Sequence, residues 1–317
     1  MGWFKDLFIA PEVAEDAPLP AQVCVNGSVA AALWPDGQVC TWELGAGQLL
    51  ARFQASGPRI ALSEHGIVDG EGWVRDVQGT EIVRLPLAGV PHWLDSRVLV
   101  LGWNQLWLGV PGEERAAQPA PGLDVSGSAR LAIHDGRAAI LDPSLSAPWL
   151  LDLATGGLQR LSGLSAPVQG GCWFEGQLHT VQEGDLVRWD QGSPTALTQR
   201  HGLQTLDVHA GAELATLGLN AEGGGELLVG SRRTPLGKLP SSPRLFASDL
   251  GLVVETWCGF ERPGGPSLEL PRRRYGRRPL VSLAVQGGHA LLGCEPVCWY
   301  RLSDATCRLQ LPGEPVA

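Results

Sequence analysis

Short apolar runs alternate with turns that contain Gly or Pro along the whole chain, and one pattern of this kind recurs eight times. In each copy an apolar or Trp-containing run is followed by a turn and by a second run that often closes on Leu-Pro. Such runs between Gly and Pro turns are typical of short β-strands. A unit repeated in this way predicts a propeller or a solenoid. The copies read VCTWELGAGQLLARF (from Val39), WVRDVQGTEIVRLP (Trp73), QLWLGVPGEERAAQ (Gln105), PWLLDLATGGLQRL (Pro148), DLVRWDQGSPTALT (Asp185), ELLVGSRRTPLGKLP (Glu226), CGFERPGGPSLELP (Cys258) and VCWYRLSDATCRLQLP (Val297).

Two further strands precede each hairpin, so that every unit contains four. In the fourth unit, ARLAIH (129–134) and RAAIL (137–141) flank Asp135-Gly136, a dipeptide that favours a tight turn with positive φ. Units begin near residues 21, 58, 91, 129, 167, 203, 243 and 280, a spacing that suits four short strands and short loops. The sequence therefore predicts an all-β fold, a single propeller of four-stranded blades over residues 21–317.

Eight blades are preferred, and seven remain open because the unit around Cys258 is the weakest. Helical periodicity is confined to the first dozen residues, which excludes an alternating βαβ domain. A β-sandwich also uses many short strands, but it does not demand equal units. We expect the last blade (280–311) to close the ring against the first (22–53).

Residues 1–20 are predicted to form a short amphipathic helix followed by a Pro-rich tether. The apolar side chains share one helical face, and Lys5 and Asp6 point away from it. A short helix is marginal until its apolar face is buried, so the segment either docks on the propeller or enters a partner's groove. The candidate partner-binding residues are Trp3, Phe4, Leu7 and Phe8.

The formal net charge of −9 disfavours long-range attraction to nucleic acid or to an anionic membrane. No apolar run approaches the roughly 20 residues that span a bilayer, and the start lacks the features of a signal peptide. These observations predict a cytoplasmic protein without a membrane span. Because Lys5 and Lys238 are the only lysines, the positive charge lies on Arg, which indicates a GC-rich bacterial genome.

The main exception to the acidic character is PRRRYGRRP, residues 271–279, in the loop before the last unit. Arg side chains suit phosphate or carboxylate groups, and an Arg-Tyr mixture can stack on a base. The alternative is a solvated loop that pairs with nearby acidic turns. Among the functional options an acidic protein surface is preferred, with RNA or a phospholigand as a weaker option. The candidate partner-binding residues are Arg272, Arg273, Arg274, Tyr275, Arg277 and Arg278.

Carboxylates recur in the loops that join the second and third strands of the units. Around a channel, such residues could bind a cation or act as acid and base in a hydrolase. Acidic residues are also ordinary in exposed turns, and we prefer that interpretation. The set contains Asp36, Asp69, Glu71, Asp142, Glu183, Asp185, Glu222 and Glu295.

The seven cysteines are scattered through predicted strands, as expected for reduced core thiols. One zinc hypothesis joins Cys294, Cys298 and Cys307 with His289, but their spacing does not match a zinc knuckle. We therefore prefer core packing and expect no metal and no other cofactor.

Two further residue types invite the same comparison between packing and function. Tryptophans near strand ends are interpreted as core, with sugar stacking as the alternative; they are Trp34, Trp103, Trp173 and Trp257. Histidines near the first turn of their units are interpreted as turn residues; they are His65, His134, His209 and His289.

The segment PWLLDLATGGLQRL resembles the repeat of pyrroloquinoline-quinone-like propellers, and Trp42-Glu43 and Trp189-Asp190 resemble the dipeptide of tryptophan-aspartate repeats. The resemblance implies the quinoprotein-like fold without the quinone, because this sequence has no adjacent cysteines. A propeller scaffold does not disclose a function.

We expect a non-enzymatic scaffold or adaptor that binds protein partners in a bacterial multiprotein system. One context suggested by the fold class is the three-part system with an AAA-type ATPase and a von Willebrand A-domain protein. The alternative is a propeller hydrolase or lyase that uses channel-mouth carboxylates on a sugar or small ester.

Overall fold

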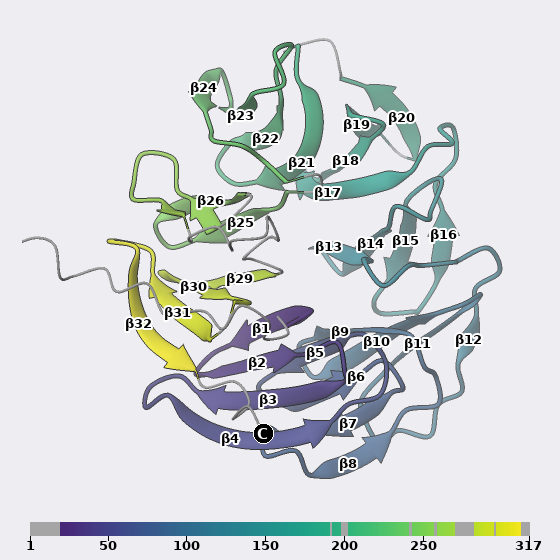
Figure 1. Cartoon of the computed structure of the whole chain (residues 1–317). Helices are drawn as coiled ribbons and strands as arrows, with labels where there is room; N and C mark the ends of the chain where they lie inside the picture. Colours follow the sequence, from purple (N-terminus) through teal and green to yellow (C-terminus); the bar gives the residue numbers. More distant parts are fainter. Residues whose placement is uncertain are drawn as a thin grey trace, which may run out of the picture.

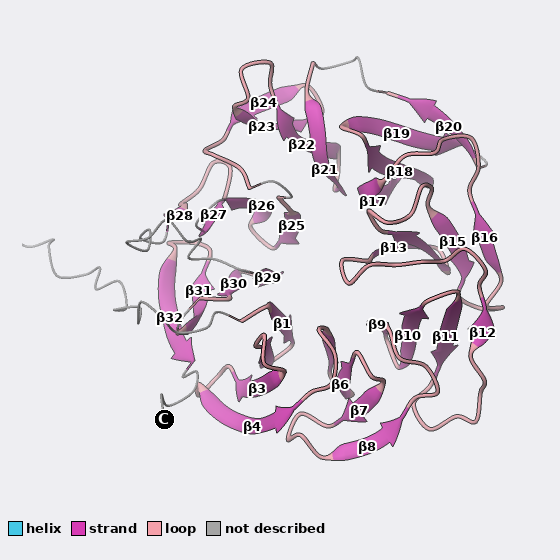
Figure 2. Ribbon diagram, turned by 45° about the vertical axis from the view of Figure 1, so that its right-hand side comes forward, coloured by secondary structure: helices cyan, strands magenta, loops and turns pink. Residues whose placement is uncertain are grey.

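The computed structural model describes residues 20–190, 192–197, 202–240, 243–256, 259–269, 282–294 and 296–311. These residues form eight four-stranded antiparallel sheets, each ordered as a simple meander. The sheets stand around a common axis with their first strands innermost, as Figures 1 and 2 show. The prediction of an eight-bladed propeller is confirmed.

The first four blades occupy the N-terminal half of the described chain. Blade 1 contains β1 (Gln22–Asn26), β2 (Val29–Leu33), β3 (Gln38–Glu43) and β4 (Gln48–Gln54). Blade 2 contains β5 (Ile60–Ser63), β6 (Gly66–Asp69), β7 (Trp73–Arg75) and β8 (Glu81–Arg84). Blade 3 contains β9 (Val90–Leu94), β10 (Arg97–Gly102), β11 (Gln105–Gly109) and β12 (Gln118–Pro119). Blade 4 contains β13 (Arg130–His134), β14 (Arg137–Leu141), β15 (Trp149–Asp152) and β16 (Leu158–Arg160).

The other four blades complete the ring. Blade 5 contains β17 (Val168–Phe174), β18 (Gln177–Gln182), β19 (Asp185–Asp190) and β20 (Ser193–Ala196). Blade 6 contains β21 (Gln204–Ala210), β22 (Leu214–Leu219), β23 (Gly225–Val229) and β24 (Arg232–Pro235). Blade 7 contains β25 (Leu245–Ser248), β26 (Gly251–Thr256), β27 (Gly259–Glu261) and β28 (Leu268–Glu269). Blade 8 contains β29 (Leu283–Gln286), β30 (His289–Leu292), β31 (Val297–Arg301) and β32 (Thr306–Leu311).

The first turn of each blade follows from local backbone chemistry. At Asp135-Gly136 both residues have positive φ, 46° and 71°, as the predicted tight turn requires. In blade 1, Asn26 pairs with Val29, so Gly27, with φ of 56°, is the first residue of the loop.

In two blades the strands differ from what the sequence led us to expect. Blade 7, the weakest unit by sequence, has four paired strands, so the seven-blade alternative is wrong. In blade 3 the outer strand β12 is two residues long and begins only at Gln118, later than the hairpin pattern predicted. The intervening charged residues Glu113, Glu114 and Arg115 are exposed, and a strand there would gain no packing.

The ring closes as expected, because β1 contacts both β5 and β29. Apolar clusters fill the spaces between neighbouring sheets; the cluster at the closure joins Val23 and Trp42 of blade 1 to Leu291 and Val297 of blade 8. Indole groups also join neighbouring inner strands: Trp93 Nε1 donates to the Ala61 carbonyl at 3.2 Å, and Trp173 Nε1 donates to the Ala132 carbonyl at 3.0 Å.

Within the described chain, no helix has the length and apolar character needed to cross a membrane. The predicted N-terminal helix, residues 1–19, lies outside the described residues.

Candidate functional site

The loops between second and third strands share one face of the ring with the loops that join consecutive blades. Asp69, at the end of β6, shows how the two kinds of loop are held together. Its carboxylate accepts hydrogen bonds from the backbone N–H groups of Ser56, Glu71 and Trp73 at 3.0 to 3.1 Å. Arg75 adds an ion pair at 2.8 Å, and both side chains are almost fully buried.

Asp142 has the same role between blades 3 and 4. It is fully buried and accepts hydrogen bonds from Ser126 Oγ at 2.9 Å and from the Ser144 backbone N–H at 2.8 Å. The interpretation of both Asp69 and Asp142 as solvated turn residues is therefore wrong, because each is a buried link between loops. The same interpretation is confirmed for five exposed members of the predicted set, Asp36, Glu71, Glu183, Asp185 and Glu222, while Glu295 lies outside the described residues.

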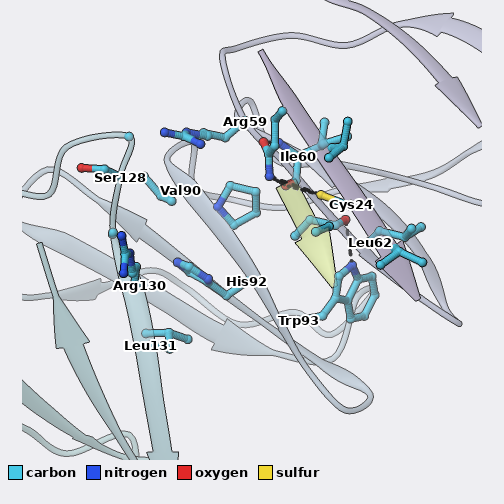
Figure 3. A pocket seen from close by; sticks show the side chains of 18 of the residues that line it. Cys24, Arg59, Ile60, Leu62, Val90, His92, Trp93, Ser128, Arg130 and Leu131 are labelled. Atoms are coloured by element: carbon cyan, nitrogen blue, oxygen red, sulfur yellow. Dashed lines mark hydrogen bonds between the residues drawn. The ribbon is translucent and has the colours of Figure 1, made fainter. Parts of the chain in front are cut away.

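A cavity of about 470 Å³ lies on the axis of the ring. Its walls come from the inner strands β1, β5, β9, β13, β25 and β29 and from the residues just before three of them. The innermost strands of blades 5 and 6 do not line it, so the cavity is displaced toward the other blades. Figure 3 shows the side chains of His92 and Arg130 pointing into this common space from neighbouring blades.

Three arginines line the cavity, and among its described lining residues there is no Asp or Glu. Arg59 and Arg244 directly precede β5 and β25, and Arg130 is the first residue of β13. All three therefore lie near the mouth of the cavity on the face that carries Asp69 and Asp142. This mouth is cationic although the whole chain is acidic.

Arg130 has a partner, whereas the other two arginines are less well compensated. Arg130 Nη1 lies 3.3 Å from each carboxylate oxygen of Asp207 on β21. That carboxylate also accepts the backbone N–H of Leu245 at 2.9 Å. Within the described residues, neither Arg59 nor Arg244 forms a salt bridge of this kind.

Burial and like charge act together on Arg244. Burial lowers the pKa of Arg244, repulsion from Arg130 lowers it further, and Arg59 adds to this effect against the attraction of Glu255 and Asp207. Burial in turn raises the pKa of Glu255, and the arginines Arg244 and Arg130 oppose this rise.

The backbone makes room for the Asp207 carboxylate at Gly170 on β17. A Cβ at Gly170 would lie 2.6 Å from Asp207 Oδ1, closer than real contacts allow. Both β17 and β21 contain a register shift at this level, between Val168 and Gly170 and between Thr205 and Asp207. The glycine and the two irregularities let blades 5 and 6 approach closely around the carboxylate.

His92 on β9 supplies an unusual polar group to the cavity. Its Nε2 is buried and has no hydrogen-bond partner among the described residues. Burial lowers the pKa of His92 to about 4, with a further contribution from Arg59. The ring is therefore neutral near pH 7, with one nitrogen that lacks a partner.

The neighbouring thiol does not balance the positive charge. Burial raises the pKa of Cys24 to about 12, so this side chain is neutral beside Arg59. Gln22 holds the strands in place here: its side-chain amide donates to the Ile60 carbonyl at 2.8 Å and accepts the Ile60 backbone N–H at 3.0 Å.

A second cavity of about 470 Å³ lies between blades 5 and 6. His179 and Arg188 line it together with the carboxylates Glu175 and Glu213. Burial lowers the pKa of His179. Its wall carries both signs of charge, in contrast to the axial cavity.

The zinc hypothesis gains no support from the described residues, where no group of three possible ligands could hold a metal ion. His289 instead stacks on Trp299 with ring centroids 5.1 Å apart. The core interpretation of the thiols is confirmed for four buried cysteines, Cys40, Cys172, Cys294 and Cys298. It is wrong for Cys307, which is exposed, while Cys258 lies outside the described residues.

The tryptophans at strand ends behave differently from one another. Trp34 is buried and packs near Trp42, and Trp173 is half-buried between blades. Trp103 contradicts the core interpretation, because it is 77% exposed on the two-residue loop between β10 and β11. Trp257 lies outside the described residues.

The interpretation of the histidines as turn residues is confirmed for His65 alone, because the other three belong to strands. His65 lies in the turn before β6, His134 and His289 end or begin strands beside such turns, and His209 lies near the end of β21.

The predicted partner-binding residues all lie outside the described residues, in the N-terminal segment and the Arg loop. The central arginines were missed, although the sequence contains a signal: Arg stands directly before an apolar residue in PRI, ARL and PRL, at the start of three repeat units. His92 follows Pro91 within the next inner strand and has no comparable repeat signal.

Comparison with known proteins supports the fold and no closer relationship. No family model matches the chain, and no curated protein matches it. Among solved structures, PorZ of Porphyromonas gingivalis, an essential bacterial surface component of the type-IX secretion system, is similar with a TM-score of 0.55 at 14% identity over 95% of this chain. The match spans 38% of the length of PorZ.

Two other propeller structures are similar at the same level. BamB from Moraxella catarrhalis has a TM-score of 0.51 at 15% identity, covering 74% of this chain and 81% of its own. The WD40 repeats of RRP9 have a TM-score of 0.51 at 10% identity and cover 87% of both chains. These likenesses concern the propeller fold alone.

Proposed function

We propose that the protein is a non-enzymatic interaction platform that binds a protein partner on the face carrying the loops between second and third strands. The observation that carries this proposal is the exposure of Trp103 on that face. Every other described Trp is buried or half-buried, so the exposure is specific to this loop. Trp is enriched among the residues that contribute most to protein interfaces.

The loop that presents Trp103 is rigid. Its neighbour Asn104 has φ of 53° and accepts the Gly122 backbone N–H through Oδ1 at 2.6 Å. The Asn104 backbone also exchanges hydrogen bonds of 2.8 Å with Ala120 and Leu123. A loop backbone held in this way loses little conformational entropy when a partner covers the loop.

One of the similar structures belongs to a multiprotein system, which is compatible with the proposed function but does not assign it. PorZ is a component of a secretion system. Bacterial origin, a cytoplasmic location and membership of a three-part ATPase and von Willebrand A-domain system are extensions of the proposal. The N-terminal segment and the Arg loop are the additional contacts it uses.

The test is quantitative affinity capture with the full tagged chain in cells that express it natively. Wild type, Trp103→Ala and Ile82→Ala are compared by mass spectrometry; Ile82 is a matched control because it is 58% exposed on the outer strand β8. We expect at least one protein to be depleted about tenfold by Trp103→Ala and retained by Ile82→Ala, equivalent to about 1.4 kcal/mol.

Two further baits examine the other contacts: a chain without residues 1–12, and a chain in which the five loop arginines are changed to Gln. The proposal fails if no protein is captured. It also fails if Trp103→Ala and both of these further baits retain every protein that the wild type captures.

One observation favours the enzymatic alternative, a hydrolase or lyase of a sugar or small ester. Burial raises the pKa of Glu255, which the sequence analysis did not select, in the direction that a general acid needs. Turnover of such a substrate that disappears in Glu255→Gln, with Trp103→Ala fully active, would favour catalysis over the platform.

A further inference from the structure

We propose that the axial cavity is a binding site for a small oxyanion, a compound with phosphate or carboxylate groups, held between Arg59, Arg130 and Arg244. This site is independent of the proposed partner surface. It rests on the charge of the cavity wall, on a polar atom without a partner, and on the size of the space.

The charge of the wall selects an anion. Arg59, Arg130 and Arg244 line the cavity, and its described lining residues include no carboxylate. Asp207 accompanies Arg130 from behind the wall, so its negative charge does not occupy the cavity itself. A cation would be repelled here, whereas guanidinium groups match the planar geometry of carboxylates and the oxygens of phosphates.

The free protein holds these cations together at a cost in free energy. Arg130 and Arg59 both lower the pKa of Arg244, which means that their guanidinium groups repel that of Arg244. An anion between them would relieve this repulsion. Its binding should therefore raise the melting temperature, because a ligand that binds only the folded state stabilises it.

The second observation is the His92 Nε2, buried without a described partner. Leaving a polar atom buried and unpaired is unfavourable by about 1–3 kcal/mol, so such an atom in a cavity indicates a missing hydrogen-bond partner. The neutral ring can donate to an oxygen of the anion or accept from a hydroxyl group on the same ligand. Figure 3 shows His92 and Arg130 facing the same space, with Arg59 at its upper edge.

The size of the space indicates a small molecule. At about 470 Å³ the cavity falls within the range of about 300–1,000 Å³ that is typical of ligand sites. The apolar side chains Val90, Leu131 and Phe246 complete the wall and would exclude water around the anion.

The experiment measures binding by isothermal titration calorimetry and by thermal shift with the full chain. The probes are inorganic phosphate, pyrophosphate and citrate, with potassium chloride at matched ionic strength and a hexa-aspartate peptide. Comparing the affinities for phosphate and pyrophosphate with the affinity for citrate distinguishes a phosphate ligand from a polycarboxylate. We expect saturable binding of at least one of the three small anions, with a melting temperature that rises with its concentration and not with chloride.

The variants Arg59→Gln and Arg244→Gln should each weaken this binding at least tenfold, and His92→Leu about threefold. Arg232→Gln is the matched control, because Arg232 is exposed on the outer strand β24 and far from the cavity lining. Circular dichroism and the melting temperature without anion establish that each variant is folded.

Three results would overturn the proposal. The first is no saturable binding of any small anion up to 10 mM, a value on the order of the weakest specific affinities. The second is equal anion affinity in wild type, Arg59→Gln and Arg244→Gln. The third is tighter binding of the aspartate peptide than of every small anion, which would assign the cavity mouth to an acidic protein segment instead.

Discussion

Two groups of buried charge on the same face of the ring differ in how completely they are compensated. In blade 2, Asp69 pairs with Arg75 and accepts three backbone N–H groups. Arg75 in turn pairs with Glu81 at 2.9 Å and lies over the Phe53 ring of blade 1, 5.2 Å from its centroid. At the axis, Arg59 and Arg244 lie in a cavity wall without a described salt bridge.

The difference separates charge that builds the fold from charge that is available to a ligand. A buried ion pair with all its hydrogen bonds made has no donor or acceptor free for a ligand, and breaking it is strongly unfavourable. Cations that line an open space with only partial compensation gain further stabilisation when an anion binds between them. Burial alone therefore does not distinguish a structural charge from a candidate ligand group, whereas incomplete compensation is the reason for proposing a site at the axis.

The largest expected effect is on Asp69. Replacing Asp69 with Ala leaves Arg75 buried and three backbone N–H groups unpaired, so the free energy of unfolding should fall by about 3–5 kcal/mol. Asp36 is the matched control, because it accepts the Gln38 N–H at 3.0 Å in the equivalent loop of blade 1 but is exposed. Asp36→Ala should lose about 1 kcal/mol or less.

Urea denaturation followed by Trp fluorescence measures both values. Similar losses for Asp69→Ala and Asp36→Ala would show that the buried network is no stronger than an ordinary turn.

The next effect is a dependence of stability on pH that comes from His92. In the unfolded chain its imidazole takes up a proton below the ordinary pKa of 6.5, whereas in the folded protein it stays neutral until about pH 4. The unfolded state therefore binds more protons between these values, and stability falls as the pH is lowered from 6.5 to 4. The full difference corresponds to about 3 kcal/mol.

His92→Leu removes this contribution, so the wild type should lose about 3 kcal/mol relative to the variant over the same pH range. Urea denaturation of both proteins at several pH values measures the relative change. Parallel stability curves for the two proteins would contradict the assignment of a buried, neutral His92.

The smallest expected effect is that of Arg59, with Arg75 as the reference. Arg75→Gln removes the partner of Asp69 and should destabilise the protein by about 3 kcal/mol. Arg59→Gln removes a poorly compensated cation, so the ligand-free protein should keep its stability or gain up to about 1 kcal/mol. Thermal and urea denaturation in a chloride buffer without phosphate or carboxylate provide the comparison, and an equal loss in both variants would show that Arg59 is structural.

Local sequence patterns determine the turns, the strands and the number of blades of this protein. The Asp135-Gly136 dipeptide determines a turn because its backbone needs positive φ, a property of two neighbouring residues. Continuous apolar runs determine second strands that are buried on both faces, such as β2 and β10, and eight similar units determine a closed ring in which the last blade meets the first. These features depend on short-range chemistry, so the sequence alone predicted them.

The candidate site depends on relations that no local pattern contains. Arg59, Arg130 and Arg244 are separated by long stretches of chain, and each alone looks like an ordinary polar residue at the start of a strand; in the sequence they are related only by their shared position in three repeat units. The ring brings equivalent positions of its units to one axis, so residues that are far apart in sequence face the same cavity. Whether a charge is compensated there depends on Asp207 and Gly170 from other blades. Only the tertiary structure decided this, because electrostatic compensation is set by distance in space and not along the chain.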